Sequence, residues 1–154
     1  DSAKPGARVR WDVANKNVEK PQYLSCLMPT PLIKGNNIFG VSYQGEFCCL
    51  NLNTGQELWK NYSLFQGKKT DCGTAFFVPQ GNREVIFTDS GELIFGELSP
   101  AGLKVVDKTA ILKPVEAARG RLVVWSHPAF ANRCIYARNN EEIVCISLAK
   151  PEGG

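Results

Sequence analysis

The sequence predicts an all-β protein built from about three four-stranded antiparallel blades of a β-propeller. Aromatic residues occupy the same place in three successive hairpins, because Phe39, Phe87 and Tyr136 are separated by 48 and 49 residues. Leucines that end the following strands keep a similar spacing, 46 and 50 residues: Leu52, Leu98 and Leu148. A repeat of about 40 to 50 residues made of four short strands is typical of a propeller blade. No stretch has the periodicity of an amphipathic helix of ten or more residues.

Composition narrows the class of protein. A chain of 154 residues with 44% hydrophobic and 21% charged residues is long enough, and apolar enough, to form one globular domain. The net charge of +3 comes without a run of basic residues, which argues against nucleic-acid binding. No apolar stretch is long enough for a transmembrane segment. Residues 1–11 contain neither an initiator Met nor a hydrophobic segment, so we expect a cut end and a longer parent chain.

The first elements are an isolated strand and a complete blade. Residues 8–13, which contain Trp11, are expected to form the outer strand of a blade whose inner strands are absent. The first full blade is expected over residues 23–62. Its turns contain Gln44-Gly45 and Asn53-Thr54-Gly55, residue types that tolerate positive φ. Its four strands are predicted at 27–33, 37–43, 46–52 and 56–62.

The second blade is expected over residues 72–111 and an incomplete third over residues 122–149. Strands of the second are predicted at 73–79, 84–88, 92–98 and 103–111, and those of the third at 122–130, 133–138 and 142–148. Residues 113–121 read as a loop with room for one helical turn. Propellers close with about four to eight blades, so three blades leave a partial ring. We expect the remaining blades elsewhere in a parent chain; a homo-oligomer that completes the ring is the other possibility.

One blade carries a motif that contains a tryptophan. The pattern Cys49-x-Asn51-x-x-Thr54-Gly55-x-x-x-Trp59 resembles the tryptophan-docking motif of the PQQ-like (quinoprotein-type) propeller repeat, Ala-x-Asp-x-x-Thr-Gly-x-x-x-Trp. In this motif the indole packs between adjacent blades, and the small residue and the glycine leave room for it. The second and third repeats lack the Thr-Gly-x-x-x-Trp part.

The resemblance covers most of residues 23–149, which look like the C-terminal blades of PQQ-binding-like β-propeller proteins of planctomycete-type bacteria. Such proteins are similar to the propeller lipoprotein of the outer-membrane assembly machinery and to quinoprotein dehydrogenases. The resemblance implies the propeller fold and export from the cytoplasm, so we expect an exported or periplasmic protein. We interpret the chain as a non-catalytic module for protein interaction or scaffolding, with the remaining blades of a parent chain and other envelope proteins as partners and no cofactor. A fragment of a PQQ-dependent oxidoreductase with calcium, and a propeller that binds carbohydrate or peptide, remain alternatives, because one fold hosts many functions.

Candidate catalytic residues are few. Cys48 and Cys49 invite comparison with the vicinal disulfide of quinoproteins, but neighbours on a strand point to opposite faces, so two separate thiols are favoured. No cluster of acidic residues suggests a calcium site, and the cysteine spacing does not suggest zinc. His127, the single histidine, is expected near the start of an innermost strand. There it either bonds a backbone group or contacts a ligand in the axial channel.

Two cysteines of the third repeat form a candidate disulfide. If Asn139-Asn140 are the two tip residues of the last hairpin, Cys134 and Cys145 lie directly opposite each other, within reach of a strained bond. Two reduced thiols packed as small apolar groups are the alternative.

Overall fold

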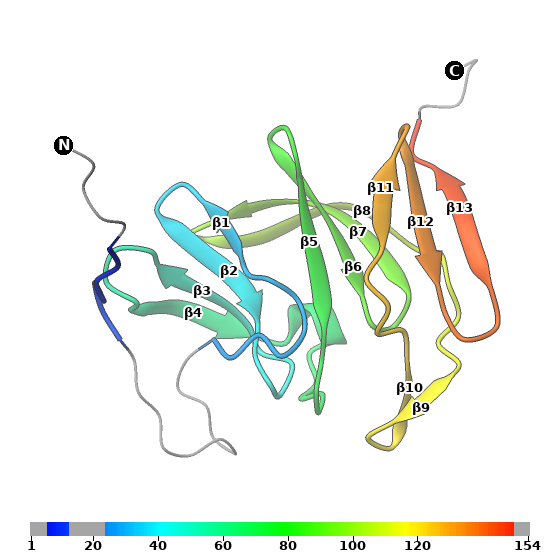
Figure 1. The fold of residues 1–154 in the computed structure, drawn as a ribbon, viewed down its shortest axis with the longest axis horizontal. Coiled ribbons are helices and arrows are strands. Elements are labelled where there is room, and N and C mark those ends of the chain that lie inside the picture. The colour runs from blue at the N-terminus through cyan, green and yellow to red at the C-terminus, as the bar shows by residue number, and fades with distance from the viewer. Residues whose placement is uncertain (1–5, 13–23, 150–154) are drawn as a thin grey trace.

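The computed structural model describes residues 6–12 and 24–149, and these residues confirm the predicted all-β fold of partial propeller blades. Three antiparallel sheets stand side by side in chain order, and we call them blades 1, 2 and 3 (Figure 1). Blade 1 has the strand order β1-β2-β3-β4, with bounds Leu32–Lys34, Asn37–Val41, Phe47–Asn51 and Glu57–Asn61. A single 3-10 turn, η1 (Ser63–Phe65), follows it.

Blades 2 and 3 repeat the same antiparallel meander. Blade 2 has the order β5-β6-β7-β8, with bounds Ala75–Gln80, Arg83–Thr88, Glu92–Ser99 and Gly102–Ala110. Blade 3 contains three strands in the described residues, β11 (Ala129–Ala131), β12 (Cys134–Arg138) and β13 (Ile143–Ser147). A short hairpin, β9 (Glu116–Ala118) with β10 (Arg121–Val123), connects the two blades.

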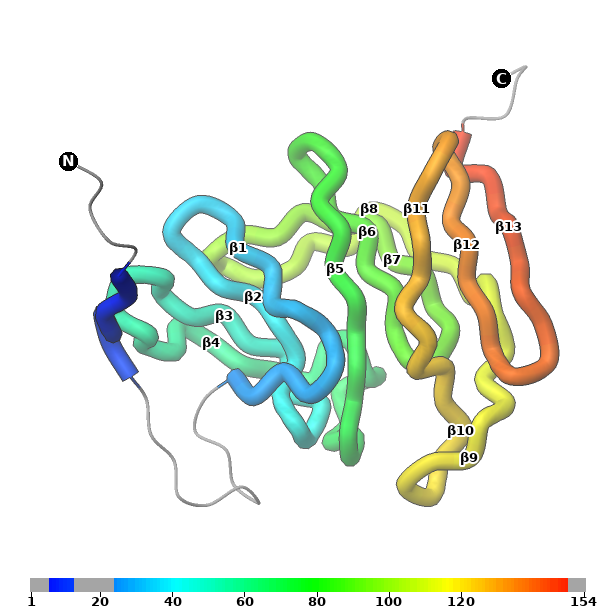
Figure 2. The backbone as a smooth tube through the Cα atoms, in the orientation of Figure 1, coloured from blue at the N-terminus to red at the C-terminus, as the bar shows by residue number. Residues whose placement is uncertain are grey.

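Most of the core lies in the two layers between neighbouring blades. Alternate residues of a strand face opposite sides of its sheet, so each blade can fill both layers. The layer between blades 1 and 2, which we call interface 1–2, contains Phe39, Phe47, Ile86 and Leu98. Interface 2–3 contains Phe76, Phe87, Leu93 and Ile135 among others. Figure 2 shows the same stacking in the backbone trace, from the cyan hairpin of blade 1 to the orange one of blade 3.

The three aromatic residues of the repeat mark equivalent positions. Phe39 is fully buried in interface 1–2, and Phe87 is fully buried in interface 2–3. Tyr136 has the same position in blade 3 and is half-buried. Each aromatic residue pairs with the inner strand of its own blade, opposite Leu32, Phe76 and Ala129 respectively. Tyr136 therefore lies on the sheet face that the following blade covers in the two earlier repeats.

The prediction of an outer strand at residues 8–13 is wrong for residues 8–12, the part that the structure describes. Residues 8–12 pair with no strand, and Val13 lies outside the described residues. Trp11 instead reaches the turn that follows β3, where its Nε1 donates a hydrogen bond to the carbonyl oxygen of Leu52, 2.9 Å away.

The segment between blades 2 and 3 also differs from the prediction. Residues 113–121 were expected to be a loop, but they contain β9 and the start of β10, because Arg119 and Gly120 both adopt positive φ and make a tight turn. The predicted strand 122–130 is split into β10 and β11. Pro128 lies in the break and has no backbone N–H to continue a ladder.

Candidate interaction site

The tryptophan of the predicted docking motif connects two blades. Trp59 lies on β4, the outer strand of blade 1, and its Nε1 donates a hydrogen bond to the carbonyl oxygen of Pro100 in blade 2, 2.8 Å away. Its ring packs edge-on against Phe47, with centroids 5.0 Å apart, and Phe47 stacks on Phe77 of blade 2 at 5.6 Å. Cys49 pairs with Trp59 across the strands and is fully buried. The indole thus contributes both an apolar surface and a directed hydrogen bond.

The rest of the motif shapes the turn between β3 and β4. The Asn51 side-chain oxygen accepts hydrogen bonds from the backbone N–H groups of Asn53 and Thr54, at 2.9 and 3.1 Å. The Thr54 hydroxyl accepts a hydrogen bond from the backbone N–H of Gln56, at 3.3 Å. Gly55 has φ of +72°, and a Cβ there would collide with the ring of Trp11. A side chain at this position is therefore excluded both by the backbone and by the indole.

Trp11 and Trp59 make the same contact one repeat apart. Each indole N–H binds a carbonyl oxygen 41 residues later, in the turn after the third strand of a blade. Residues 8–12 form no strand, yet Trp11 makes the same kind of hydrogen bond that Trp59 makes from β4. Blade 2 has no equivalent residue, because Thr109 pairs with Leu93 where blade 1 pairs Trp59 with Cys49.

A buried ion pair makes a second connection across interface 1–2. The Nζ of Lys34, at the end of β1, lies 2.6 Å from Oε1 of Glu84 in β6. The Glu84 side chain is 1% exposed, and its other oxygen accepts the backbone N–H of Leu98 at 2.8 Å. Lys34 is 36% exposed and keeps contact with water. Both oxygens of the buried carboxylate are satisfied, as burial of a charge requires.

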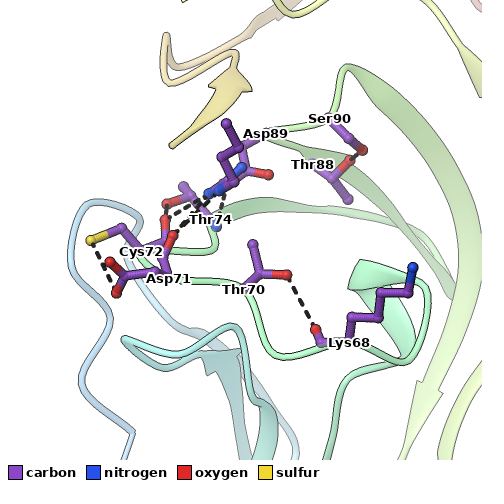
Figure 3. Close-up of polar contacts among 9 residues, drawn as sticks. Lys68, Thr70, Asp71, Cys72, Thr74, Thr88, Asp89 and Ser90 are labelled. Carbon is purple, nitrogen blue, oxygen red and sulfur yellow. Dashed lines mark hydrogen bonds and ion pairs between the residues drawn. The ribbon is translucent and has the colours of Figure 1, made fainter. Parts of the chain in front are cut away.

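Loops from different blades meet around a second ion pair, and Figure 3 shows Asp71, Cys72, Thr74 and Asp89 close together at this point. Arg121, on β10, donates from Nη2 to Oδ2 of Asp89 at 2.7 Å, and the Asp89 side chain is 1% exposed. The same guanidinium group donates to the carbonyl oxygens of Asp71 and Cys72, at 3.2 and 3.3 Å. The backbone N–H of Thr74 also donates to Asp89, at 2.8 Å. One arginine therefore fixes the connection between blades 1 and 2 against the end of β6.

A shallow cavity of about 240 Å³ lies beside this ion pair. Arg121, Asp89 and Ser90 form part of its lining, and two exposed lysines, Lys68 and Lys69, come from the loop after η1. Neither lysine forms an ion pair with a described residue, whereas Glu92, the other acidic residue of the lining, pairs with Lys108 at 3.7 Å, so the uncompensated charge of the cavity is positive. We call this cavity and the loops around it the basic loop site.

The hairpin tip of blade 1 supports the same loops. The backbone N–H of Thr70 donates to Gln44, and that of Cys72 donates to Tyr43, at 2.9 and 2.8 Å. The pKa of Tyr43 is raised, chiefly because its hydroxyl binds the Asp71 carboxylate. The basic loop site is thus held by bonds to both blades, which makes its shape largely preformed.

His127 lies just before β11, next to Phe76. The two ring centroids are 4.5 Å apart, and Nδ1 lies 2.9 Å from the carbonyl oxygen of Pro128. The backbone contact fits the structural role considered for this histidine. A contact with a ligand in the axial channel stays a prediction.

The predicted placement of Cys134 opposite Cys145 is wrong. Cys134 pairs with Ser147 and Tyr136 pairs with Cys145, so the two cysteines are diagonal neighbours, and both are free thiols. The hairpin loop has four residues between the paired positions, because Asn139 accepts two backbone N–H groups and closes a wider turn. The pKa of Cys134 is raised by desolvation and by its hydrogen bond to Cys145. The disulfide itself stays a prediction.

Cys48 and Cys49 are both free and buried, and they face different surroundings. The sulfur of Cys48 lies 3.7 Å from the Ser42 hydroxyl, and burial raises the pKa of this thiol to about 12. Cys49 faces interface 1–2, where its sulfur lies 3.9 Å from the side-chain oxygen of Asn37. The alternation of strand residues that predicted two separate thiols is the geometry seen here.

Sequence reasoning missed the ion-pair residues Lys34, Glu84 and Asp89. It identified Arg121 only as part of a mildly basic loop, residues 113–121, that is a candidate for protein contacts. One signal was available for Glu84, which shares a strand face with Ile86, a residue of the core. A carboxylate at such a position needs a buried partner. Nothing local identified Lys34, 50 residues away, as that partner.

Two searches of the described residues are negative. They contain no group of three or more His, Cys, Asp or Glu side chains placed to hold a metal ion. Among the described elements, no helix has the length and apolar character needed to cross a membrane.

Comparison with known proteins gives one sequence relative and several structural ones. No protein-family model matches the chain. A stretch of 61 residues is 34% identical to the outer membrane protein assembly factor BamB of Shewanella oneidensis, covering 39% of this chain and 15% of that protein. The crystal structure of BamB from Moraxella catarrhalis superposes with a TM-score of 0.51 and 14% identity, over 77% of this chain and 32% of that one.

A computationally designed protein, Ika4, superposes with a TM-score of 0.49 and 11% identity, over 94% of this chain and 100% of that one. The chain spans less than a third of the length of the BamB structure that it matches. The fold of the described residues is that of part of a β-propeller, and it is similar to BamB.

Proposed function

We propose that the chain is part of a non-catalytic β-propeller module for protein interaction or scaffolding in the cell envelope. The basic loop site carries this proposal. It joins loops of two blades around a positively charged cavity, and the Asp89–Arg121 ion pair holds its shape before any partner binds. Preformed loops on a rigid scaffold are common binding surfaces.

The likeness to BamB supports the cell envelope as the location. BamB is named for its part in outer membrane protein assembly, and its similarity to this chain extends over 61 residues. We infer a periplasmic or exported protein that has envelope proteins as partners and needs no cofactor. A closer relation to the propeller proteins of planctomycete-type bacteria is part of the same proposal.

The open face of blade 3 supports a second kind of partner, the remaining blades of a parent chain. Tyr136 occupies the place that Phe39 and Phe87 occupy in the buried interfaces, yet it stays half-exposed. Ile143, on the edge strand of the same sheet, is 72% exposed. A further blade that packs on this sheet would bury both, as the repeat does elsewhere. We propose that such blades associate through the kind of tryptophan contact that Trp59 makes between blades 1 and 2.

Site-specific cross-linking tests the role of the basic loop site. A photo-reactive residue at position 69 of the full-length protein should capture an envelope protein, whereas the same residue at position 104, an exposed lysine on β8, should not. The double variant Lys68→Glu/Lys69→Glu should reduce the capture, and Lys104→Glu should leave it unchanged. Equal capture from positions 69 and 104 would contradict the proposed site.

A second measurement separates this function from quinoprotein chemistry. Pyrroloquinoline quinone and Ca²⁺ are added to the full-length protein, and quinone absorbance and dye-linked alcohol oxidation are followed. We expect neither signal. Reproducible oxidation would contradict the scaffold function and favour the oxidoreductase alternative.

A further inference from the structure

The cavity between blades 2 and 3 has an apolar interior and a cationic residue in its lining. Its volume is about 360 Å³. Val78 and Pro79 come from β5 of blade 2, Phe130 from β11, and Leu148 from the end of β13. Arg133, in the exposed turn between β11 and β12, also lines it. A volume of this size is at the lower end of the range of small-molecule sites, about 300 to 1,000 Å³.

The repeat shows what fills the same place in interface 1–2. Val78 of blade 2 is equivalent to Lys34 of blade 1. Lys34 pairs with the residue two places before Phe39, and Val78 pairs with the residue two places before Phe87. By the same count Arg133 of blade 3 is equivalent to Glu84 of blade 2, since Arg133 lies three places before Tyr136 and Glu84 lies three places before Phe87. At these two positions of the repeat, interface 2–3 therefore has a valine and an arginine in place of the Lys34–Glu84 ion pair. Glu84 is buried within β6, whereas Arg133 lies in an exposed turn with φ of +58°.

This replacement leaves a cation without its anion. Glu84 binds a lysine of the preceding blade at 2.6 Å. Arg133 lines the same cavity as Val78, which carries no charge, and it forms no ion pair with any residue that the structure describes. Interface 2–3 also lacks the indole of Trp59, whose place in the register is taken by the exposed Thr109. Two groups that fill and connect interface 1–2 are thus absent from interface 2–3.

We propose that this cavity binds a small carboxylate with an apolar body. The guanidinium group of Arg133 presents parallel N–H donors that match the two oxygens of a carboxylate. The walls of Val78, Pro79, Phe130 and Leu148 bury an alkyl chain or a ring behind it. The ligand supplies the negative charge that Glu84 supplies in the neighbouring interface. This site is separate from the basic loop site and does not rest on the protein-interaction function.

Titration calorimetry with octanoate tests the site. We expect octanoate to bind the unmodified chain, and octanol and octylamine, which share its tail but lack the carboxylate, to bind at least about tenfold more weakly. Arg133→Gln should weaken octanoate binding by a similar factor. Arg138 is an exposed arginine at the end of β12, outside the cavity lining, so Arg138→Gln should leave octanoate binding unchanged.

A double variant distinguishes a lost ligand site from a damaged fold. Val78→Lys with Arg133→Glu rebuilds in interface 2–3 the pair found in interface 1–2, and should abolish octanoate binding without lowering the melting temperature. Octanoate binding that is equal in Arg133→Gln and the unmodified chain would overturn the proposal, as would equal binding of octanol. A peptide ending in a leucine carboxylate is tested beside octanoate. Binding of the peptide alone would overturn the assignment to a small molecule.

Discussion

Replacing Lys34 with methionine is expected to destabilise the chain more than replacing its partner Glu84 with glutamine. The reason is the unequal burial of the two side chains, 36% exposed for Lys34 and 1% for Glu84. Lys34→Met leaves a buried carboxylate whose remaining described partner is the N–H of Leu98. Breaking a buried pair in this way costs about 3 to 5 kcal/mol of unfolding free energy. Glu84→Gln keeps an acceptor for Leu98 and leaves an ammonium group that can turn to water, so we expect about 1 to 2 kcal/mol.

Urea unfolding followed by tryptophan fluorescence measures both losses. The double variant Lys34→Met/Glu84→Gln should recover most of the stability lost in Lys34→Met, because it removes the unpaired buried charge. Lys60→Met is the control. Lys60 and Glu57 form an ion pair with side chains 46% and 31% exposed, and its loss should cost less than about 1 kcal/mol. A loss in Lys34→Met no greater than that in Glu84→Gln would refute the argument from burial.

Three further predictions concern turns, thiols and the basic loop site. Gly91→Ala should lower the free energy of unfolding by more than about 2 kcal/mol, because φ is +77° and a Cβ would collide with a backbone carbonyl oxygen. Gly81→Ala, with φ of +61° and no atom within 4 Å of the Cβ, should cost about 1 to 2 kcal/mol, so equal losses would contradict the steric argument. In mass spectrometry after iodoacetamide treatment of the native chain, Cys145, which is exposed, should be alkylated first and Cys48 last. Since the pKa of Cys48 is raised to about 12, its rate should still be rising with pH above pH 10, and early labelling of Cys48 would disprove its burial. Arg121→Gln should accelerate amide hydrogen exchange in the loop after η1 while exchange in β2 stays unchanged, and unchanged exchange in both would contradict a holding role for this arginine.

The fold could be predicted because its signal is repeated. Phe39 and Phe87 each fill a layer between blades, and a spacing of 48 residues shows that relation without any contact information. Register was harder to predict, since it depends on turn length. A two-residue tip at Asn139-Asn140 places Cys134 opposite Cys145, whereas the four-residue loop closed by the Asn139 side chain shifts the partner by two positions.

The charged residues of the candidate sites could not be predicted in the same way. Arg121 reaches Asp89 across 32 residues and Asp71 across 50, and no periodic pattern connects residues in different loops. The docking motif was visible because its residues lie close together in the sequence, between Cys49 and Trp59. The carbonyl group that Trp59 binds, on Pro100, carries no side-chain signature and is found only once blades 1 and 2 are placed side by side.

The shared separation of 41 residues between each tryptophan and its carbonyl acceptor has a consequence for how such a chain can grow. A stretch one repeat long that includes Trp11 or Trp59 and one of the turns at Leu52 and Pro100 contains one indole that reaches forward and one turn that receives an indole from behind. Tandem duplication of any such stretch would therefore add a complete interblade contact without the invention of a new surface. An insertion of only part of a repeat would separate donor from acceptor by the wrong length, so growth of the array is restricted to whole blades.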